Sequence, residues 1–124
     1  MLITEYFHNL ESEILQCVHV VESNIVKDQR SLHIGLIEGR LVFSDASALH
    51  FIEFVSVKRA TEVYKYSYHY QDREGVLLFR YDSAPHHREI LTFPYHKHIP
   101  ENEVIDSIRP TLSEVLDEIE KMVA

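Results

Sequence analysis

The sequence predicts an α+β fold: a single antiparallel β-meander sheet with N-terminal and C-terminal helices packed on one face. Apolar residues recur at helical spacing near both ends of the chain, whereas residues 19 to 82 hold short runs of Val, Ile, Phe and Tyr broken by polar turns. Consecutive hairpins with no helix between them favour a meander. With 124 residues, of which 45% are hydrophobic, the chain from 1 to 124 is expected to form one domain.

The predicted helices lie at the two ends. The first spans residues 4 to 18, with Thr4 as its N-cap. The C-terminal helices span residues 101 to 123: a short piece at 101 to 108 follows Pro100, and a longer helix begins at the capping box Thr111-Leu112-Ser113-Glu114. Both ends of the chain therefore offer an apolar helix face that can cover a sheet.

Between the helices, β-branched and aromatic residues predict six strands, at residues 19–26, 32–38, 40–44, 50–57, 62–71 and 76–82. The tripeptide Glu38-Gly39-Arg40 is interpreted as a tight turn that joins the second and third strands. A meander of this kind has at least one open edge, and pairing of that edge with a second copy would give a homo-oligomer.

The most regular segment is the hairpin from residue 62 to 82. Tyrosines alternate with polar residues, so that Tyr64, Tyr66, Tyr68 and Tyr70 share one face of the strand. A four-residue loop at 72–75 would place Lys65, Ser67, His69, Arg80 and Asp82 together on the other face, by pairing residue 71 with 76, 69 with 78, 67 with 80 and 65 with 82. Those five residues form either a binding site or an ordinary solvated face. The tyrosines form either a core layer under a helix or a base-stacking platform.

Histidines gather immediately after this hairpin. His86, His87, His96 and His98 fall within thirteen positions of a chain that has 9 histidines in all. Two imidazoles can act as base and acid in RNA cleavage, with Arg80 or Lys97 stabilising the phosphorane. The same histidines with Asp82 could instead ligate Zn²⁺ or Mn²⁺, or form a pH-responsive surface without a site.

Composition excludes several function classes. Twelve Lys and Arg against twenty Asp and Glu give a charge of −8, which argues against general coating of DNA. A single cysteine, Cys17, excludes an internal disulfide and a multi-cysteine zinc site. The sequence carries no Gly-rich phosphate loop and no dinucleotide fingerprint, so no cofactor is expected. No secretory signal and no apolar stretch of about 20 residues is present, and a cytoplasmic protein without a membrane partner is expected.

Three motifs occur in order between residues 64 and 98: Tyr66-Ser67-Tyr68-His69-Tyr70-Gln71, Phe79-Arg80-Tyr81-Asp82-Ser83-Ala84-Pro85-His86-His87, and Phe93-Pro94-Tyr95-His96-Lys97-His98. In these motifs the chain resembles the TumE-type toxin family of prokaryotic toxin-antitoxin systems. The resemblance implies a small cytoplasmic protein encoded beside a helix-turn-helix antitoxin. Asn is common in that family at the position of Ser83 and His at the position of Tyr95, so this chain departs from the pattern at two points.

Together these observations lead to the hypothesis of a toxin that acts on RNA as a metal-independent endoribonuclease. His86 and either His96 or His98 would serve as acid and base, and Arg80 would bind phosphate. The expected substrate-binding residues are Lys65, Tyr68, His69, Asp82, His87 and Lys97. Two alternatives stay open: a non-enzymatic module that docks a partner protein, and a metal protein with ligands from Asp82, His86, His87, His96 and His98.

Overall fold

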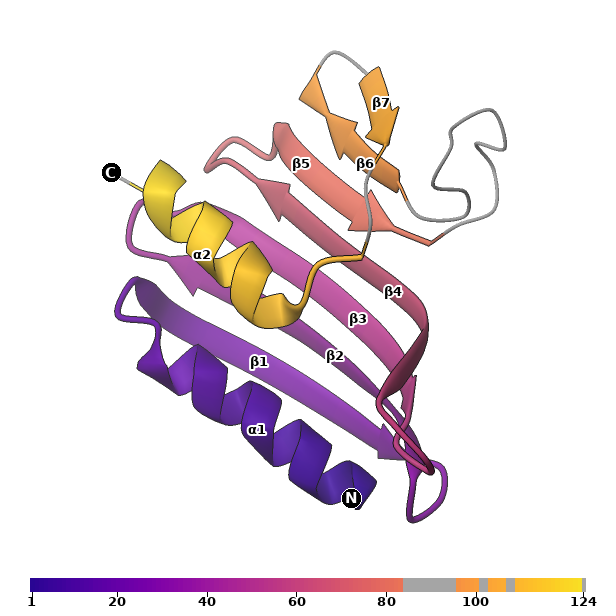
Figure 1. Cartoon of the computed structure of the whole chain (residues 1–124). Helices are drawn as coiled ribbons and strands as arrows, with labels where there is room; N and C mark the ends of the chain where they lie inside the picture. Colours follow the sequence, from indigo (N-terminus) through magenta and orange to yellow (C-terminus); the bar gives the residue numbers. More distant parts are fainter. Residues whose placement is uncertain (84–95, 101–102, 107–108, 124) are drawn as a thin grey trace.

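A computed structural model describes residues 1–83, 96–100, 103–106 and 109–123, and these form one sheet covered on one face by two helices (Figure 1). The strands lie side by side in chain order, β1 to β7, and every neighbouring pair is antiparallel. The predicted α+β meander is therefore confirmed. The elements are α1 (Ile3–Gln16), β1 (Val20–Gln29), β2 (Ile34–Phe43), β3 (Ala48–Ser56), β4 (Glu62–Gln71), β5 (Leu77–Asp82), β6 (His96–Ile99), β7 (Glu103–Asp106) and α2 (Leu112–Met122).

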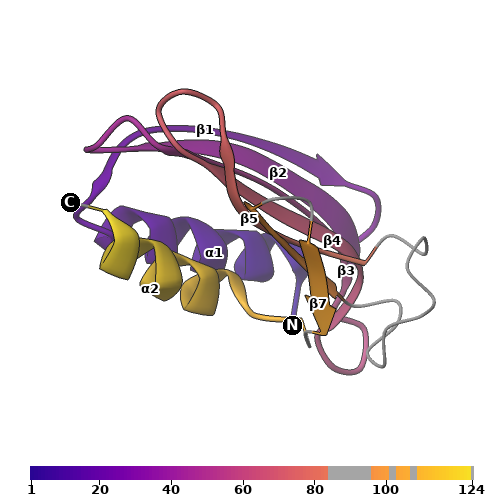
Figure 2. The same cartoon turned by 90° about the horizontal axis from the view of Figure 1, so that it is seen from above.

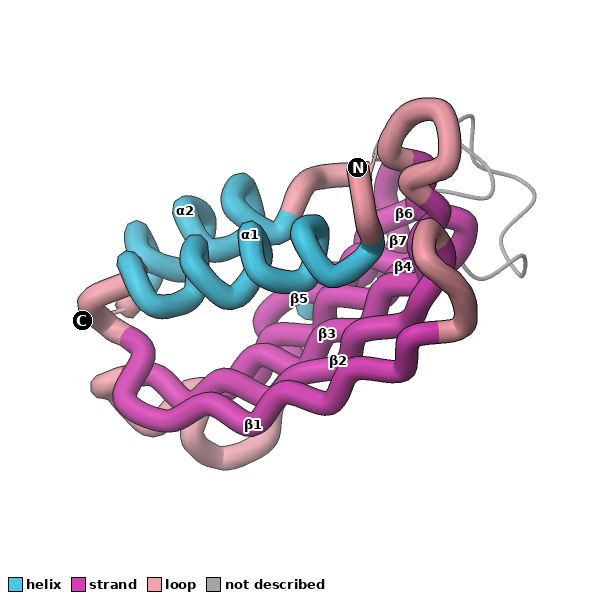
Figure 3. The backbone as a smooth tube through the Cα atoms, turned by 90° about the horizontal axis from the view of Figure 1, so that it is seen from below, coloured by secondary structure: helices cyan, strands magenta, loops and turns pink. Residues whose placement is uncertain are grey.

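The two helices lie next to each other against the same face of the sheet, which curves over them (Figures 2 and 3). Apolar residues of both helices and the inward residues of the strands form one core, which is why each helix carries its apolar stripe on a single side. The opposite face of the sheet, which we call the outer face, is covered by neither helix (Figure 3). The helix-facing layer is therefore structural, and the outer face is available for function.

Two details at the helix ends follow from hydrogen bonding. The predicted capping box of α2 is confirmed, because the Glu114 backbone N–H donates to the Thr111 hydroxyl at 3.1 Å and the Thr111 N–H donates to the Glu114 carboxylate at 3.1 Å. The predicted N-cap of α1 is wrong: the helix begins at Ile3, and the Leu2 N–H donates to Glu5 Oε1 at 3.1 Å. Thr4 therefore lies inside the first turn.

The predicted turn at Glu38-Gly39-Arg40 is also wrong, because β2 passes straight through Gly39. Gly39 is paired with Phe51 of β3, and a Cβ atom at this position would lie 2.5 Å from the Phe51 ring and 2.7 Å from Ile25. The glycine is needed for the close approach of a neighbouring ring and not for a reversal of the chain. The segments 32–38 and 40–44 are consequently one strand.

The short helix predicted at 101–108 is replaced by strand β7, Glu103–Asp106, and residues 101–102 and 107–108 lie outside the described residues. Strand β7 pairs with β6, which lies in the histidine-rich segment where the sequence predicts no strand. Formation of that ladder satisfies backbone groups along both strands and overrides the local helical signal after Pro100. Within the described part of the chain the sheet therefore has seven strands, where the sequence predicts six.

The β4–β5 hairpin has the predicted faces but a register displaced by two residues. His69 is paired with Arg80 and Ser67 with Asp82, with a bulge between Tyr70 and Gln71. The loop closes through Asp72, whose N–H donates to the Val76 carbonyl at 2.9 Å and whose carboxylate accepts from the Val76 N–H at 2.9 Å. Because side chains alternate with a period of two, a displacement by two residues leaves each on its predicted face.

Candidate functional site

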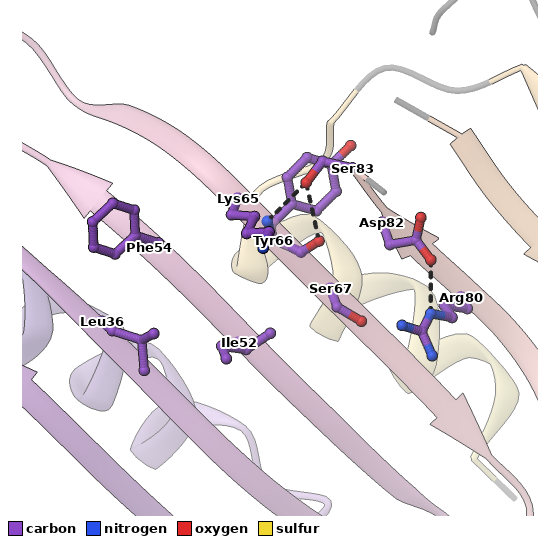
Figure 4. A pocket seen from close by; sticks show the side chains of 9 residues that line it. All are labelled: Leu36, Ile52, Phe54, Lys65, Tyr66, Ser67, Arg80, Asp82 and Ser83. Carbon is purple, nitrogen blue, oxygen red and sulfur yellow. Dashed lines mark hydrogen bonds and ion pairs between the residues drawn. The ribbon is translucent and has the colours of Figure 1, made fainter. Parts of the chain in front are cut away.

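The polar residues predicted to share a face do meet on the outer face of β4, β5 and β6. Lys65, Ser67, Arg80 and Asp82 line one hollow of about 230 Å³ (Figure 4). The register brings His98 of β6 beside Arg80, so an imidazole joins the group. The prediction that these polar residues share one face of the sheet is therefore confirmed.

Asp82 is the centre of this group. Its side chain is only 4% exposed, and its Oδ2 lies 2.7 Å from Arg80 Nε and 3.3 Å from His98 Nε2. A buried carboxylate is stabilised by cationic and N–H partners, and in return it fixes their orientation. We call these residues the Arg80–Asp82–His98 cluster.

The two partners of Asp82 differ in access to solvent. The Arg80 side chain is 41% exposed, whereas that of His98 is 18% exposed. Arg80 bonds to Asp82 through Nε, and the guanidinium has further N–H donors on its other two nitrogens. Arg80 can therefore contact a bound phosphate while it stays attached to Asp82.

The other wall of the hollow is apolar. Leu36, Ile52 and Phe54 of β2 and β3 line it, opposite the charged residues of β4 and β5 (Figure 4). The Phe54 ring lies 5.8 Å from the Tyr64 ring, centroid to centroid, and the Arg30 guanidinium lies 5.6 Å from its centre. A flat apolar surface beside cationic side chains matches the two halves of a nucleotide, an aromatic base and an anionic phosphate.

His69 lies on the same face, next to Arg80. Burial lowers the pKa of the His69 imidazole, and the neighbouring positive charge of Arg80 lowers it further. His69 is accordingly a neutral donor and acceptor at pH 7, positioned beside a cation.

Tyr68 and Lys97, which the sequence predicts to contact substrate, lie on the helix-covered face. Tyr68 is fully buried and its hydroxyl donates to Glu53 Oε2 at 2.5 Å. Lys97 Nζ lies 2.9 Å from Glu118 Oε2 of α2 and 4.7 Å from the centre of the Tyr81 ring. Tyr66, Tyr68 and Tyr70 are buried in the core, as the core-layer interpretation of the tyrosines predicts, and they offer no base-stacking platform. The predicted shared face is wrong for Tyr64, which is exposed and lies beside Phe54, because the register of β3 and β4 shifts between Phe54 and Val55.

The predicted histidines are placed unevenly. His86 and His87 lie outside the described residues. The backbone of His96 pairs with Asp82, so His96 occupies the register position next to the cluster, and His98 belongs to the cluster itself. Among the described side chains, no three His, Cys, Asp or Glu residues come together as metal ligands.

Sequence reasoning missed a second polar group, on the covered face. Glu53 of β3 is fully buried and accepts hydrogen bonds from the hydroxyls of Tyr6 in α1 and Tyr68 in β4. Arg109, just before α2, is close enough to interact electrostatically with Glu53 and Tyr68. The sequence does hold a signal for this group, because Glu53 occupies an inward position in the alternation Leu49, Phe51, Glu53, Val55.

The tyrosines of this group are held in their protonated form. Burial raises the pKa of both the Tyr6 and Tyr68 hydroxyls, and the Glu53 carboxylate raises each further. Glu53 and its partners come from α1, β3, β4 and the segment before α2. The group therefore links both ends of the chain to the sheet. We interpret it as structural and place the candidate site on the outer face.

An open meander sheet with two helices on one face and an Arg–Asp–His cluster on the other defines a small α+β domain suited to binding anions or transferring protons. The model of the family described as Toxin TumE matches residues 10–123, so the chain belongs to the TumE toxin family. No curated protein and no solved structure matches the chain. Family membership makes it the toxin component of a toxin-antitoxin system, with an antitoxin as its partner. Within the described residues, neither helix is long and apolar enough to cross a membrane.

Proposed function

We propose that this toxin is a metal-independent endoribonuclease, and that cleavage takes place at the Arg80–Asp82–His98 cluster. The observation that carries the proposal is the position of Asp82, which holds a guanidinium and an imidazole from adjacent strands within 3.3 Å of one carboxylate oxygen. The apolar wall with Phe54 supports it, because a base can lie there while its phosphate reaches Arg80.

The proposed reaction uses only groups of the RNA and the protein. The ribose 2′-hydroxyl attacks the adjacent phosphorus, and the bond from phosphorus to the 5′-oxygen of the next nucleotide breaks. A base removes the proton from the 2′-hydroxyl, and an acid donates a proton to the leaving 5′-oxygen. The products end in a 2′,3′-cyclic phosphate and a 5′-hydroxyl, so the atoms balance without a further reactant.

Each residue has a definite role in this proposal. His98 is one member of the acid–base pair, and Asp82 orients its ring in the way that a carboxylate orients the histidine of a catalytic triad. His96 or His86 supplies the other member. Arg80 stabilises the negative charge that develops on the phosphorane oxygens. Lys65, Ser67 and His69 contact the RNA on either side of the broken bond.

Two further features of the proposal concern partners and location. We propose that the antitoxin is of helix-turn-helix type, and that the chain acts in the cytoplasm, where its RNA substrate is found. A homo-oligomer could form through β1, because that strand pairs with β2 alone within the described part of the sheet. Native mass measured with and without antitoxin tests both associations.

Purified protein incubated with RNA at low salt tests the proposed reaction. We expect His98→Ala to slow cleavage by about 10²- to 10⁴-fold through loss of acid–base catalysis. Arg80→Ala is expected to slow it by about 10²- to 10³-fold through loss of charge stabilisation. Arg73→Ala, which removes an exposed arginine from the β4–β5 loop, is the matched control and should cleave at the wild-type rate.

Circular dichroism melts establish that the variants are folded before their rates are compared. Cleavage by the wild type should persist with a chelator present. Equal rates for wild type, Arg80→Ala and His98→Ala would overturn the proposal. If an expressing host still stops growing when Arg80 and His98 are both replaced, the non-enzymatic binding module is favoured. If the chelator abolishes activity, a metal site is favoured.

A further inference from the structure

Basic side chains form a row that runs across the outer face at right angles to the strands. The register pairs Arg40 of β2 with His50 of β3, His50 with His69 of β4, His69 with Arg80 of β5, and Arg80 with His98 of β6. Each member is directly opposite the next, so all five lie on one face. At about 4.8 Å between strands, the row is about 19 Å long.

Two acidic residues of the adjacent row partly balance this charge. Glu38 Oε1 lies 2.9 Å from His50 Nε2, and Asp82 pairs with Arg80 and His98. Arg40 is exposed at the far end of the row. On a chain with a net charge of −8, the two arginines of the row balance these two carboxylates, so the row is a local departure from the acidic surface.

The hollow lies beside this row. Leu36, Ile52 and Phe54 belong to the same strands as the row but are set further along them, on the side of Lys65. The apolar wall at Phe54, whose ring also carries the Arg30 guanidinium, can accept a base only if that base is unpaired, because a base in a duplex has both faces stacked and its edge paired. The row and the hollow together therefore fit a nucleic-acid strand whose bases are unpaired and turned away from its backbone.

We propose that the row of Arg40, His50, His69, Arg80 and His98 is the track for the sugar–phosphate backbone of single-stranded RNA, with one unpaired base seated on the Phe54 side of it. This inference rests on the proposed function and adds to it a substrate class and a direction: the strand crosses β2 to β6, and the bond to be broken lies at the β5–β6 end. Arg40 and His50 are then binding residues about 10–19 Å from the reacting phosphate.

The test is binding of a fluorescently labelled 2′-O-methyl RNA, which has no free 2′-hydroxyl and is not cleaved. Anisotropy titrations over a range of salt concentrations give the dependence of log K on log salt, whose slope is about −0.7 per phosphate contact for a single strand. We expect Arg40→Gln to weaken binding and to make the slope shallower by about 0.7. Lys121→Gln, which removes an exposed cation from α2 on the opposite face, is the matched control and should change neither quantity.

The same titration with a duplex of identical sequence tests the substrate class, and weaker binding of the duplex is expected. An unchanged slope in Arg40→Gln, or equal affinity for duplex and single strand, would overturn the row proposal. Cleavage of unmodified RNA is measured separately. If RNA is cleaved but Arg40→Gln binds it as tightly as the wild type, the row proposal alone is wrong. If binding depends on Arg40 but no RNA is cleaved, the proposed reaction alone is wrong.

Discussion

At the scale of single residues, Gly39 shows how one small side chain sets the shape of the sheet. Its hydrogen leaves room for the Phe51 ring to lie over β2, which lets β2 and β3 pair without a break across nine consecutive partners. The ring supplies the apolar cover that the glycine lacks, an arrangement in which an aromatic residue compensates a strand glycine.

We expect Gly39→Ala to destabilise the protein by about 1–3 kcal/mol, because the added methyl group would lie 2.5 Å from a ring that is fixed in the core. Urea unfolding followed by circular dichroism measures the change. Gly75→Asn is the comparison, since Gly75 has a positive φ of 85° that asparagine tolerates, and a Cβ there meets no atom within 4 Å. Equal stability of Gly39→Ala and wild type would mean that Phe51 moves aside freely.

At the scale of secondary-structure elements, α2 is held by polar contacts as well as by its apolar stripe. Glu118 accepts from the Tyr81 hydroxyl at 2.7 Å and from Lys97 Nζ at 2.9 Å, so one carboxylate ties the helix to both β5 and β6. Burial lowers the pKa of Lys97, but its bonds to Tyr81 and Glu118 raise it by more, which keeps the ammonium charged.

Lys97→Met separates a structural role of this lysine from a role in substrate binding. We expect it to lower the free energy of unfolding by about 1.5–3 kcal/mol, the usual worth of a hydrogen bond to a charged group. RNA cleavage at a temperature where the variant is folded should be unchanged. If Lys97→Met loses most of its cleavage activity but keeps the stability of the wild type, Lys97 has a role in substrate binding. The double variant Lys97→Met/Glu118→Gln should lose less unfolding free energy than the sum of the two single variants, because the two residues share one contact.

The elements also show what the sequence could and could not predict. Alternation predicts the faces of residues 66–70 in β4, and the Thr111 capping box predicts the start of α2, because both signals are local. The alternation is wrong for Tyr64, because a register shift between β3 and β4 interrupts it there. The turn at Gly39 and the helix after Pro100 are wrong because the deciding partners, Phe51 and strand β6, are brought by the fold. The alternation places Glu53 on the inward face, but its partners from α1 and from the residues before α2 are brought to it only by the fold.

The candidate site could be predicted only in part for the same reason. The shared face of Lys65, Ser67, Arg80 and Asp82 follows from the period of a single hairpin. That Arg40 and His50 continue the line of Arg80 depends on the register of two further strand pairs, which no local pattern specifies. The roles proposed for His86 and His87 stay predictions.

At the scale of the whole molecule, the charge is divided between the two faces of one sheet. The covered face buries a carboxylate, Glu53, among tyrosines, whereas the uncovered face carries the basic row. On a chain of overall charge −8, the proposed docking of RNA on this row depends on local contacts and not on the overall field, so we expect specific docking and no general adhesion to nucleic acid.

The buried tyrosines give the global stability a defined pH dependence. The pKa values of Tyr6 and Tyr68 are raised in the folded protein, so above pH 10 the unfolded chain releases protons that the folded chain retains. The contribution of these tyrosines to the free energy of unfolding should therefore be constant below this pH and fall as pH rises above it. Urea titrations between pH 9 and pH 11 measure the decline.

Tyr6→Phe should make that decline shallower, because one of the protons that the folded protein retains is removed. Tyr64→Phe is the matched control: Tyr64 is 55% exposed, and the change should leave the decline as it is in the wild type. A decline that is equally steep in all three proteins would assign it to other groups and would contradict a contribution from Tyr6.

The strand order has a consequence for how the protein is made. Because each strand pairs with the one that follows it in the chain, most of the sheet closes through short loops, which lowers contact order and favours fast folding. The sheet can grow strand by strand as the polypeptide leaves the ribosome, with α1 already present to cover its first strands. His98 and α2 follow these strands in the chain, so the Arg80–Asp82–His98 cluster is completed only after most of the sheet has formed. During synthesis, most of the sheet can thus fold before the candidate site is complete.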